Sequence, residues 1–335
     1  MNRTALVALT LLSTAALAAT TPRARPTLQR AATQVGLVFD VGGRGDRGFK
    51  DAADQGLMRA ASELGVKATV VEPRTDAVGA LRRIVAEKPA LAVGVGFTFS
   101  EPMHALAREF PGQSLVCVDY APVDGQAMPP GLLGIRFKEQ EGSFLVGALA
   151  ALVSKGNKLG FVGGMDVPVI RRFQAGFLAG ARHVRPDVEV KTVYVAKGPE
   201  GFASPGLGKS QALALYDQGV EIIFHASGAT GLGVFEAAKE RGKLVIGVDA
   251  DQWSAAPGHV LTSMVKRVDT AVYDAIKRVQ DGTFKGGVVD LDLKSGGVDY
   301  VYNENNRKLI PDDVRARVEA LRGEIVAGKI VVPAQ

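Results

Sequence analysis

Acidic residues follow several apolar runs of the chain, where they could accept hydrogen bonds from a ligand. Asp40 follows the run VGLVF, Asp119 follows SLVCV, and Asp249 and Asp251 follow LVIGV. Ionised carboxylates form strong, charge-assisted hydrogen bonds, so a group of them in a cleft suits the hydroxyl groups of a sugar. An Asp in such a place can instead cap the next helix or turn. Because three runs in both halves of the chain end this way, the pattern favours one shared binding site.

Two aromatic residues and one cation could add to such a site. Phe49 lies in VGGRGDRGFKD and Phe202 in AKGPEGFASPGLGKS, two loop-like segments in which a core residue would be unexpected. Rings that face each other across a cleft would hold a planar ligand, and aromatic pairs contribute about 0.5–1.5 kcal/mol beyond burial. The alternative is that each ring packs onto its own lobe. Lys266 follows an apolar run and either reaches the cleft or lies on the surface.

The sequence contains no recognisable catalytic or metal-binding set. ASPGLGKS (203–210) approaches the phosphate-binding loop pattern, but Ala203 stands at the first glycine position and a proline interrupts the loop. Cys117 lies inside an apolar run, which favours inert packing over a nucleophile. The four histidines are scattered, without metal-ligand spacing: His104, His183, His225 and His259. We therefore expect neither a metal nor a cofactor.

Glycine-rich turns form a further candidate feature. They occur at residues 94–99, 162–166 and 226–233, and none has the spacing of a dinucleotide-binding fingerprint. They are either tight turns at helix starts or places where backbone N–H groups line a ligand site. Gly228 belongs to the last of them.

Alternating strands and helices are predicted to position these residues. Strands are predicted at 35–39, 67–71, 91–94, 114–118 and 132–137, with helices at 49–64, 76–87, 101–109 and 142–153. The pattern restarts at Lys158, with strands at 159–162, 188–195, 222–224, 244–248 and 260–264 and helices at 168–183, 209–218 and 231–241. This alternation is typical of an α/β protein with two doubly wound parallel-sheet lobes. In such sheets ligands bind outside the carboxyl ends of the strands.

The composition fits two folded lobes and argues against nucleic acid as a partner. The 335 residues are 47% apolar, a length typical of about two domains. One Cys excludes a disulfide framework. The net charge of +5 comes mostly from four arginines that precede Asp40, since 36 basic and 35 acidic residues follow them. The folded part is therefore nearly neutral, unlike a basic DNA-binding face.

The first 33 residues are predicted to contain an export signal followed by a flexible leader. Residues 1–18 have a positive start at Arg3, an apolar run and the pattern Ala16-Leu17-Ala18, which together indicate a secretory signal peptide. The apolar run of about 14 mostly small residues is too short to span a membrane. Residues 19–33 are predicted to be a flexible leader. No lipobox Cys lies near the cleavage pattern, so we expect an exported protein in the periplasm or cell envelope, either free or held by its leader.

Several longer blocks resemble the basic-membrane-protein family of ABC-transporter substrate-binding proteins, whose best-known members are purine nucleoside receptors. The blocks are FDVGGRGDRGFKDAA, KLGFVGGMDVPVIRRFQAGFLAGA, ALYDQGVEIIFHASGATGLGVFEAAKE, VIGVDADQW and LTSMVKRVDTAVYDAI, and the resemblance covers about residues 34–333. It implies a type I periplasmic-binding-protein fold with a three-strand hinge. The implied lobes are 34–137 plus about 267–288, and 138–266 plus about 289–335.

The resemblance also implies roles for individual residues. Phe49 and Phe202 resemble the rings that sandwich the base, and Asp40 and Asp119 match acidic contacts near the base and the cleft. The residues that match the ribose contacts are Gly228, Asp249 and Lys266, with Asp251 as a substitute for Asp249. The family usually has Ser-Phe-Asn where this chain has Gly48-Phe49-Lys50. Because Lys50 offers only donors, it would favour base carbonyl oxygens, as in guanine or hypoxanthine.

The leading hypothesis is therefore a monomeric, non-enzymatic receptor that captures a nucleoside and delivers it to a membrane permease. A receptor for riboflavin or a free purine base is the nearest alternative. A nucleoside-hydrolysing enzyme would need several Asp close together on one loop, whereas these lie on strands far apart in the chain. A ligand-sensing transcriptional regulator shares this fold, but this chain has a signal peptide where a DNA-binding helix-turn-helix would stand.

Overall fold

The computed structural model describes residues 33–335 together with Met1. The predicted signal peptide and the predicted leader up to residue 32 lie outside these described residues. Within residues 33–335, no helix has both the length and the apolar character that crossing a membrane requires.

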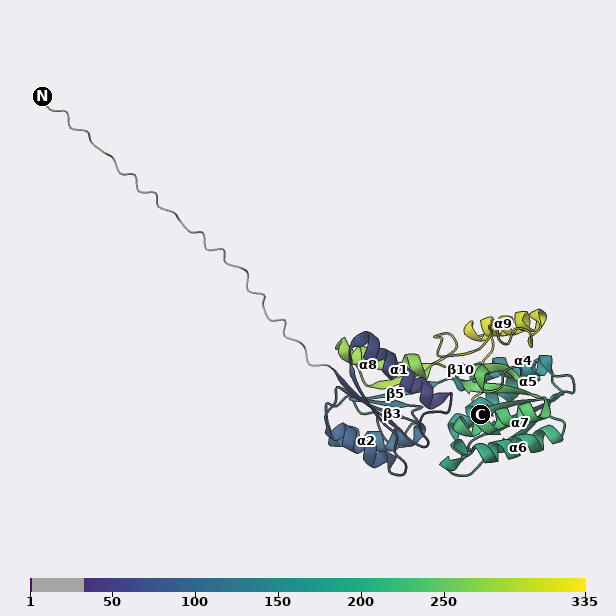
Figure 1. Ribbon diagram of the computed structural model, residues 1–335, viewed down its shortest axis with the longest axis horizontal. Coiled ribbons are helices and arrows are strands. Elements are labelled where there is room, and N and C mark those ends of the chain that lie inside the picture. The colour runs from purple at the N-terminus through teal and green to yellow at the C-terminus, as the bar shows by residue number, and fades with distance from the viewer. Residues whose placement is uncertain (2–32) are drawn as a thin grey trace. The chain divides into compact units, whose positions relative to one another are not determined.

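Two six-stranded sheets form the centres of two lobes (Figure 1). All neighbouring strands of the first sheet run parallel, in the order β11-β5-β4-β3-β1-β2. Its strands are β1 (Gln34–Phe39), β2 (Lys67–Val71), β3 (Leu91–Val95), β4 (Leu115–Val118), β5 (Leu132–Phe137) and β11 (Gly287–Leu291). Strand β3 is buried along its whole length, because helices cover both faces of the sheet.

The second sheet repeats this arrangement, in the order β12-β10-β9-β8-β6-β7. Its strands are β6 (Lys158–Gly163), β7 (Glu189–Tyr194), β8 (Ile222–Ala226), β9 (Leu244–Asp249), β10 (Val260–Lys266) and β12 (Val298–Tyr300). Only the edge strand β12 is antiparallel to its neighbour in this sheet. The two halves therefore have the predicted α/β architecture.

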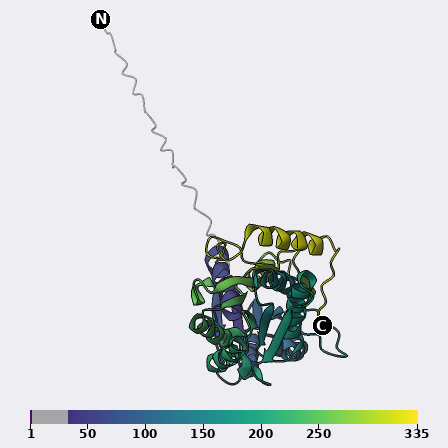
Figure 2. The same ribbon diagram turned by 90° about the vertical axis from the view of Figure 1, so that its right-hand side faces the viewer.

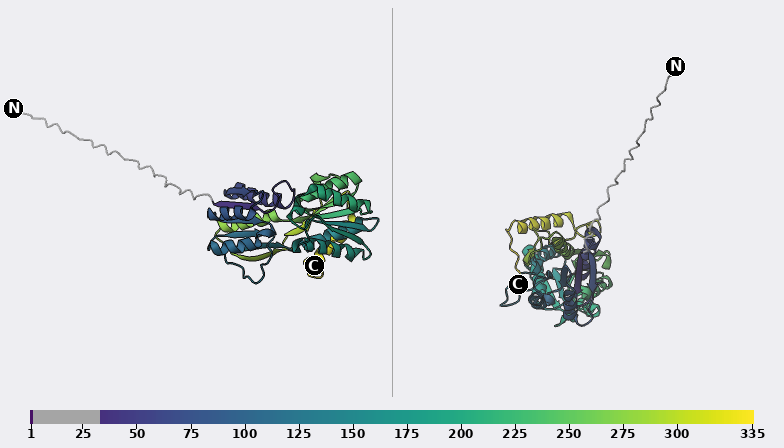
Figure 3. Two further views of the ribbon diagram at one scale, coloured as in Figure 1. Left: turned by 90° about the horizontal axis from the view of Figure 1, so that it is seen from below. Right: turned by 90° about the vertical axis from the view of Figure 1, so that its left-hand side faces the viewer.

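Helices flank both sheets (Figure 3). The first lobe contains α1 (Phe49–Leu64), α2 (Ala77–Ala86), α3 (Ser100–Glu109) and α8 (Val268–Gln280). The second contains α4 (Glu139–Val153), α5 (Pro168–Val184), α6 (Pro205–Asp217), α7 (Gly231–Arg241) and α9 (Asp312–Val326). Figure 2 shows α9 crossing the outer face of the second lobe, where it packs on α4.

Local signals explain several helix boundaries. The side chain of Asp76 caps α2 by accepting a hydrogen bond from the N–H of Gly79 at 2.8 Å. Pro168 and Pro205 stand in the first turns of α5 and α6, where a missing N–H does no harm. These signals are readable from the sequence, and the predicted helix starts at 168 and 231 match the structure.

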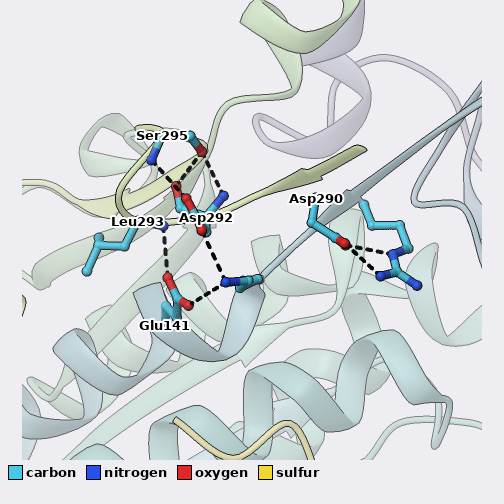
Figure 4. Close-up of polar contacts among 7 residues, drawn as sticks. Glu141, Asp290, Asp292, Leu293 and Ser295 are labelled. Atoms are coloured by element: carbon cyan, nitrogen blue, oxygen red, sulfur yellow. Dashed lines mark hydrogen bonds and ion pairs between the residues drawn. The ribbon is translucent and has the colours of Figure 1, made fainter. Parts of the chain in front are cut away.

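The chain passes between the lobes three times: from β5 to α4, from β10 to α8 and from β11 to β12. Two of these crossovers are joined by polar contacts (Figure 4). The side chain of Glu141 accepts a hydrogen bond from the N–H of Leu293 at 2.9 Å, and Lys138 lies 3.3 Å from Glu141 and 3.1 Å from Asp292. The boundary predicted near residue 288 falls within β11, which belongs to the first sheet as far as Leu291.

Candidate functional site

A cavity lies between the two lobes, with an empty volume of about 770 Å³ including its opening to solvent. Eight of the nine predicted site residues line it: Asp40, Phe49, Lys50, Asp119, Phe202, Gly228, Asp249 and Lys266. The two sheets thus direct strand ends from distant parts of the chain toward one space.

The acidic residues reach the cavity because they stand where parallel strands end. Asp40 follows β1, Asp119 follows β4, and Asp249 is the last residue of β9. Asp119 and Asp249 have positive φ angles, 62° and 68°, in the left-handed region that is unfavourable for most side chains. Asp tolerates this conformation better than most residues, and such backbone strain gathers at functional sites. The equivalent strand end of each lobe therefore presents its carboxylate from the same strained conformation.

One polar cluster lies on the first lobe. Lys50 forms a buried ion pair with Asp40, and the hydroxyl of Thr98 donates a hydrogen bond to the other oxygen of Asp40 at 3.1 Å. Gly96 makes room for this carboxylate, since a Cβ there would collide with Asp40, and its φ of 127° excludes most other residues. The cluster offers a cation and a carboxylate side by side on the cavity wall.

The loop before α1 is held by Asp46, which is 3% exposed. Its carboxylate accepts hydrogen bonds from the N–H groups of Gly48 and Lys50, each at 2.9 Å, and so satisfies free donors at the start of α1. Burial raises the pKa of Asp46, although these hydrogen bonds oppose the shift. Asp46 thereby fixes the start of the helix that carries Phe49 and Lys50.

A second polar cluster joins the lobes around Lys266. Its ammonium lies 2.7 Å from the carboxylate of Asp119 on the first lobe and 3.1 Å from that of Glu139 at the start of α4. Arg172 supports Glu139 through a 2.6 Å contact. Burial alone would lower the pKa of Lys266, but the neighbouring carboxylates of Asp119, Glu139 and Asp249 outweigh it and raise the pKa. Lys266 is therefore a charged residue inside the site, not a surface residue.

Asp249 is the least compensated charge of the cavity. It is 7% exposed, and its Oδ1 is buried without a hydrogen-bond partner among the described residues. Burial raises its pKa to about 7, while the nearby Lys266 opposes the shift. Buried polar atoms normally have partners, so an orphaned acceptor on a residue that lines the cavity is suited to donors of a ligand.

Aromatic residues from both lobes line the same cavity. Phe49 begins α1 on the first lobe, and Phe202 ends the short 3-10 helix Pro199–Phe202 on the second. Phe97 of the first lobe contacts Phe202 edge-on, with ring centroids 6.4 Å apart. The ammonium groups of Lys266 and Lys50 lie 5.0 Å and 5.4 Å from the centre of the Phe49 ring. The cavity therefore combines flat apolar walls with charged groups close to them.

Asp251 is the one predicted site residue that does not line the cavity. Its side chain is exposed and accepts hydrogen bonds from the N–H of Trp253 at 3.0 Å and from the side-chain amide of Asn303 at 2.9 Å. Asp251 acts as a turn-capping residue within the second lobe. Of the two acidic residues at and just after the end of β9, Asp249 is therefore the one that lines the cavity.

Several cavity residues were missed by the sequence analysis. Asp46, Phe97, Thr98 and Phe173 line the cavity as well. Phe97 and Thr98 belong to a glycine-rich turn that drew attention only for its backbone. Phe173 lies on the inner face of α5, where nothing in the sequence distinguishes it from a core residue.

Other candidate features lie apart from the cavity. Lys209 of the loop-like pattern 203–210 is on α6 and pairs with Glu236 and Glu240 of α7. Burial raises the pKa of the Cys117 thiol to about 12 and lowers that of His225 to about 4. Within residues 33–335 no group of His, Cys, Asp or Glu is arranged to hold a metal ion.

Fold and cavity together define a two-lobed binding protein of the type I periplasmic-binding-protein class. A family model described as ABC transporter substrate-binding protein PnrA-like matches residues 33–335. The chain therefore belongs to this family, as its sequence blocks predicted. Members of the family are substrate-binding proteins of ABC transporters, which work outside the cytoplasmic membrane.

Individual relatives agree with this assignment. The chain is 38% identical over 281 residues to an uncharacterized lipoprotein of Pyrococcus horikoshii, covering 80% of this chain and 68% of the relative. It is 35% identical over 328 residues to the CD4+ T-cell-stimulating antigen of Listeria monocytogenes, covering 89% and 87%. The crystal structure of an ABC transporter solute-binding protein from Aeropyrum pernix superposes with a TM-score of 0.81 at 32% identity, covering 90% of this chain and 94% of that one.

Proposed function

We propose that this protein binds a nucleoside, most readily a 6-oxopurine nucleoside such as guanosine or inosine, in the cavity between its lobes. The observation that carries the proposal is the pairing of aromatic walls from opposite lobes with two separate charged clusters in one cavity. A planar base needs flat apolar walls, and a ribose needs acceptors for its hydroxyl groups. A nucleoside uses both.

In this proposal the base lies between Phe49 and Phe202. Lys50 donates to a carbonyl oxygen at the base edge, and its partner Asp40 accepts from a neighbouring ring N–H. Asp119, Asp249 and Lys266 hold the ribose, with Gly228 bringing its backbone close. Because these groups come from both lobes, a bound nucleoside favours the closed arrangement of an open–closed equilibrium.

Isothermal titration calorimetry with guanosine, inosine and adenosine tests the proposal. We expect heat and saturable binding with the first two nucleosides. The absence of binding to all three, together with tight binding of riboflavin or a free purine base, would replace the nucleoside by one of those ligands. Mass spectrometry of the small molecule that co-purifies with the protein provides an independent identification.

We further propose that the protein binds its ligand without converting it. Incubation with inosine followed by chromatography for free hypoxanthine tests this point, and release of base at catalytic rates would contradict it. The expected partner is a membrane permease, to which the closed lobes deliver the ligand. We propose a monomer, which light scattering during gel filtration measures directly.

Export completes the proposed function. The predicted signal peptide would carry the chain across the membrane, and we propose that the two lobes then act in the periplasm or cell envelope. The alternative is a form attached to the membrane, because some relatives are named lipoproteins. Fractionation of cells with and without detergent separates the free from the attached form.

A further inference from the structure

A buried glutamine behind the cavity links the two lobes. Gln252 is 1% exposed and does not line the cavity, although it follows Asp249 by only three residues. Its side-chain amide lies between the end of β9 in the second lobe and the loop before α1 in the first. Gln252 can therefore stabilise the closed arrangement of the lobes without contacting a ligand in the cavity.

The orientation of this amide is fixed inside the second lobe. Its Oε1 accepts a hydrogen bond from the N–H of Val248 at 2.8 Å and lies 3.2 Å from Nε2 of His225. His225 is fully buried and burial lowers its pKa to about 4, so its neutral ring can donate from Nε2 to this oxygen. The backbone N–H of Gln252 donates to the hydroxyl of Ser263 at 3.1 Å. A reversed amide would face the N–H of Val248 with its own NH₂ group, which excludes that orientation.

With its oxygen held in this way, the amide nitrogen points across the lobe boundary. Nε2 of Gln252 donates to the backbone carbonyl of Asp46 at 3.4 Å. Asp46 is the residue whose carboxylate fixes the start of α1, and with it Phe49 and Lys50. Through Asp46, Gln252 therefore influences the position of Phe49 and Lys50, the residues proposed to contact the base.

A second observation shows how closely the lobes meet at this point. A Cβ on Gly48 would lie 3.3 Å from Nε2 of Gln252, 3.3 Å from the carbonyl oxygen of Val248 and 3.5 Å from Oδ2 of Asp249. The start of α1 thus rests directly against the end of β9, including the carboxylate of Asp249. An opening of the lobes would separate this contact and expose the amide of Gln252 to water.

We propose that Gln252 is a positioning residue that holds the Asp46 loop, and hence Phe49 and Lys50, against the end of β9 in the closed form. This inference deepens the proposed function, on which its ligand-binding part rests. Gln252 touches neither ligand nor cavity; it acts by stabilising the closed arrangement in which both charged clusters face one space.

A fluorescence measurement tests the inference without a ligand. Dyes attached to R83C on α2 and E236C on α7 report the separation of the lobes, because both native side chains are largely exposed, 70% and 57%. Cys117 is buried and its thiol pKa is raised to about 12, so it does not compete for the dyes. We expect the ligand-free protein to show a smaller closed fraction after Gln252→Ala.

A matched pair of variants separates the cross-lobe contact from the internal one. Gln252→Glu, studied at pH 8.5, keeps an acceptor for the N–H of Val248 but loses the donor to Asp46, so it should open the lobes as Gln252→Ala does. Gln218→Ala is the control, because Gln218 is an exposed amide on the second lobe whose one side-chain hydrogen bond within residues 33–335 is accepted from Lys191. If Gln252→Glu has the same closed fraction as the native protein, the hydrogen bond to Asp46 does not contribute to closure. The effect of Gln252→Ala would then come from contacts inside the second lobe, and the proposal would be overturned.

Stopped-flow binding of inosine supplies the second readout. Loss of one closure contact should raise the dissociation rate by ~3–10-fold, the equivalent of one hydrogen bond, and leave the association rate nearly unchanged. Equal closed fractions and equal dissociation rates in the native protein and both Gln252 variants would overturn the proposal. If the native protein binds none of guanosine, inosine and adenosine, the proposed function fails, whereas the ligand-free fluorescence comparison still decides the role of Gln252.

Discussion

Replacing Asp249 by Asn should stabilise the ligand-free protein at pH 8 while weakening ligand binding. The carboxylate is buried, and its Oδ1 has no hydrogen-bond partner among the described residues. Burial raises its pKa to about 7. At pH 8 the folded protein therefore carries an incompletely compensated charge, and an Asn of the same size removes it.

The sign and size of the effect follow from proton linkage. The ordinary pKa of this group is 3.8, so between about pH 4 and pH 7 the folded chain keeps a proton that the unfolded chain has released. The free energy of unfolding of the native protein must then fall as the pH rises through this window. A shift of about three pKa units corresponds to roughly 4 kcal/mol as an upper limit. Since an Asn side chain also buries polar atoms, we expect a gain of about 1–3 kcal/mol at pH 8.

Urea unfolding at pH 4.5, 6 and 8 measures this gain, with calorimetry for the ligand. The free energy of unfolding of Asp249→Asn should exceed that of the native protein only slightly at pH 4.5, and the difference should grow toward pH 8. The affinity of the variant for inosine should fall by ~10–100-fold, because charge-assisted hydrogen bonds are lost. The exposed Asp251→Asn serves as the control. A constant difference across the pH range, or a loss of stability at pH 8, would refute the reasoning, because Asp249 would then be ionised and fully compensated in the folded protein.

Three further predictions concern the walls, the charge and the hinge of the site. Phe49→Ala and Phe202→Ala should each weaken binding of inosine by about 1–3 kcal/mol with little change in unfolding temperature, and unchanged calorimetric affinity in both would remove the aromatic sandwich. Inosine 5′-monophosphate should bind at least ~100-fold more weakly than inosine, because the cavity contains four carboxylates and two ammonium groups; equal affinity would contradict this electrostatic argument. Glu141→Ala should lower the free energy of unfolding by about 1 kcal/mol and broaden the lobe-separation signal, since it removes the acceptor for Leu293 at the crossovers, whereas Glu141→Gln, which keeps that acceptor, should change little.

The repeated strand–helix pattern was sufficient to predict the two sheets, because buried parallel strands have continuous apolar runs and their helices have clear amphipathic faces. No bounds for helices or strands were predicted after residue 264. Strand β11 has an alternating, half-exposed pattern, and β12 has only three residues, so neither gives the signal of a buried strand. Their place in the two sheets depends on tertiary pairing that a local pattern does not contain.

The candidate site was predictable to the extent that it uses strand ends. Asp40, Asp119, Asp249 and Lys266 follow apolar runs, and the rule that ligands bind at the carboxyl ends of parallel strands brings them together. Asp46 and Gln252 gave no such signal. Gln252 bonds to the backbone of Asp46, which is distant in the sequence. Asp46 bonds to N–H groups that come close only in this particular loop conformation. Neither set of partners can be recognised before the chain is folded.

The charges between the lobes explain why such a protein can couple closure to its ligand. Asp119, Asp249 and Lys266 are all buried where the lobes meet, and burying charges is costly unless each has a partner. Lys266 compensates Asp119, but within residues 33–335 Oδ1 of Asp249 has no hydrogen-bond partner. Contacts such as that of Gln252 with the carbonyl of Asp46 favour closure and oppose this cost. In the proposed mechanism the ribose hydroxyls donate to the orphaned carboxylate, which removes part of the cost of burying it. A ligand shifts an equilibrium by its differential affinity for the two states, and we propose that Asp249 provides that difference at this site.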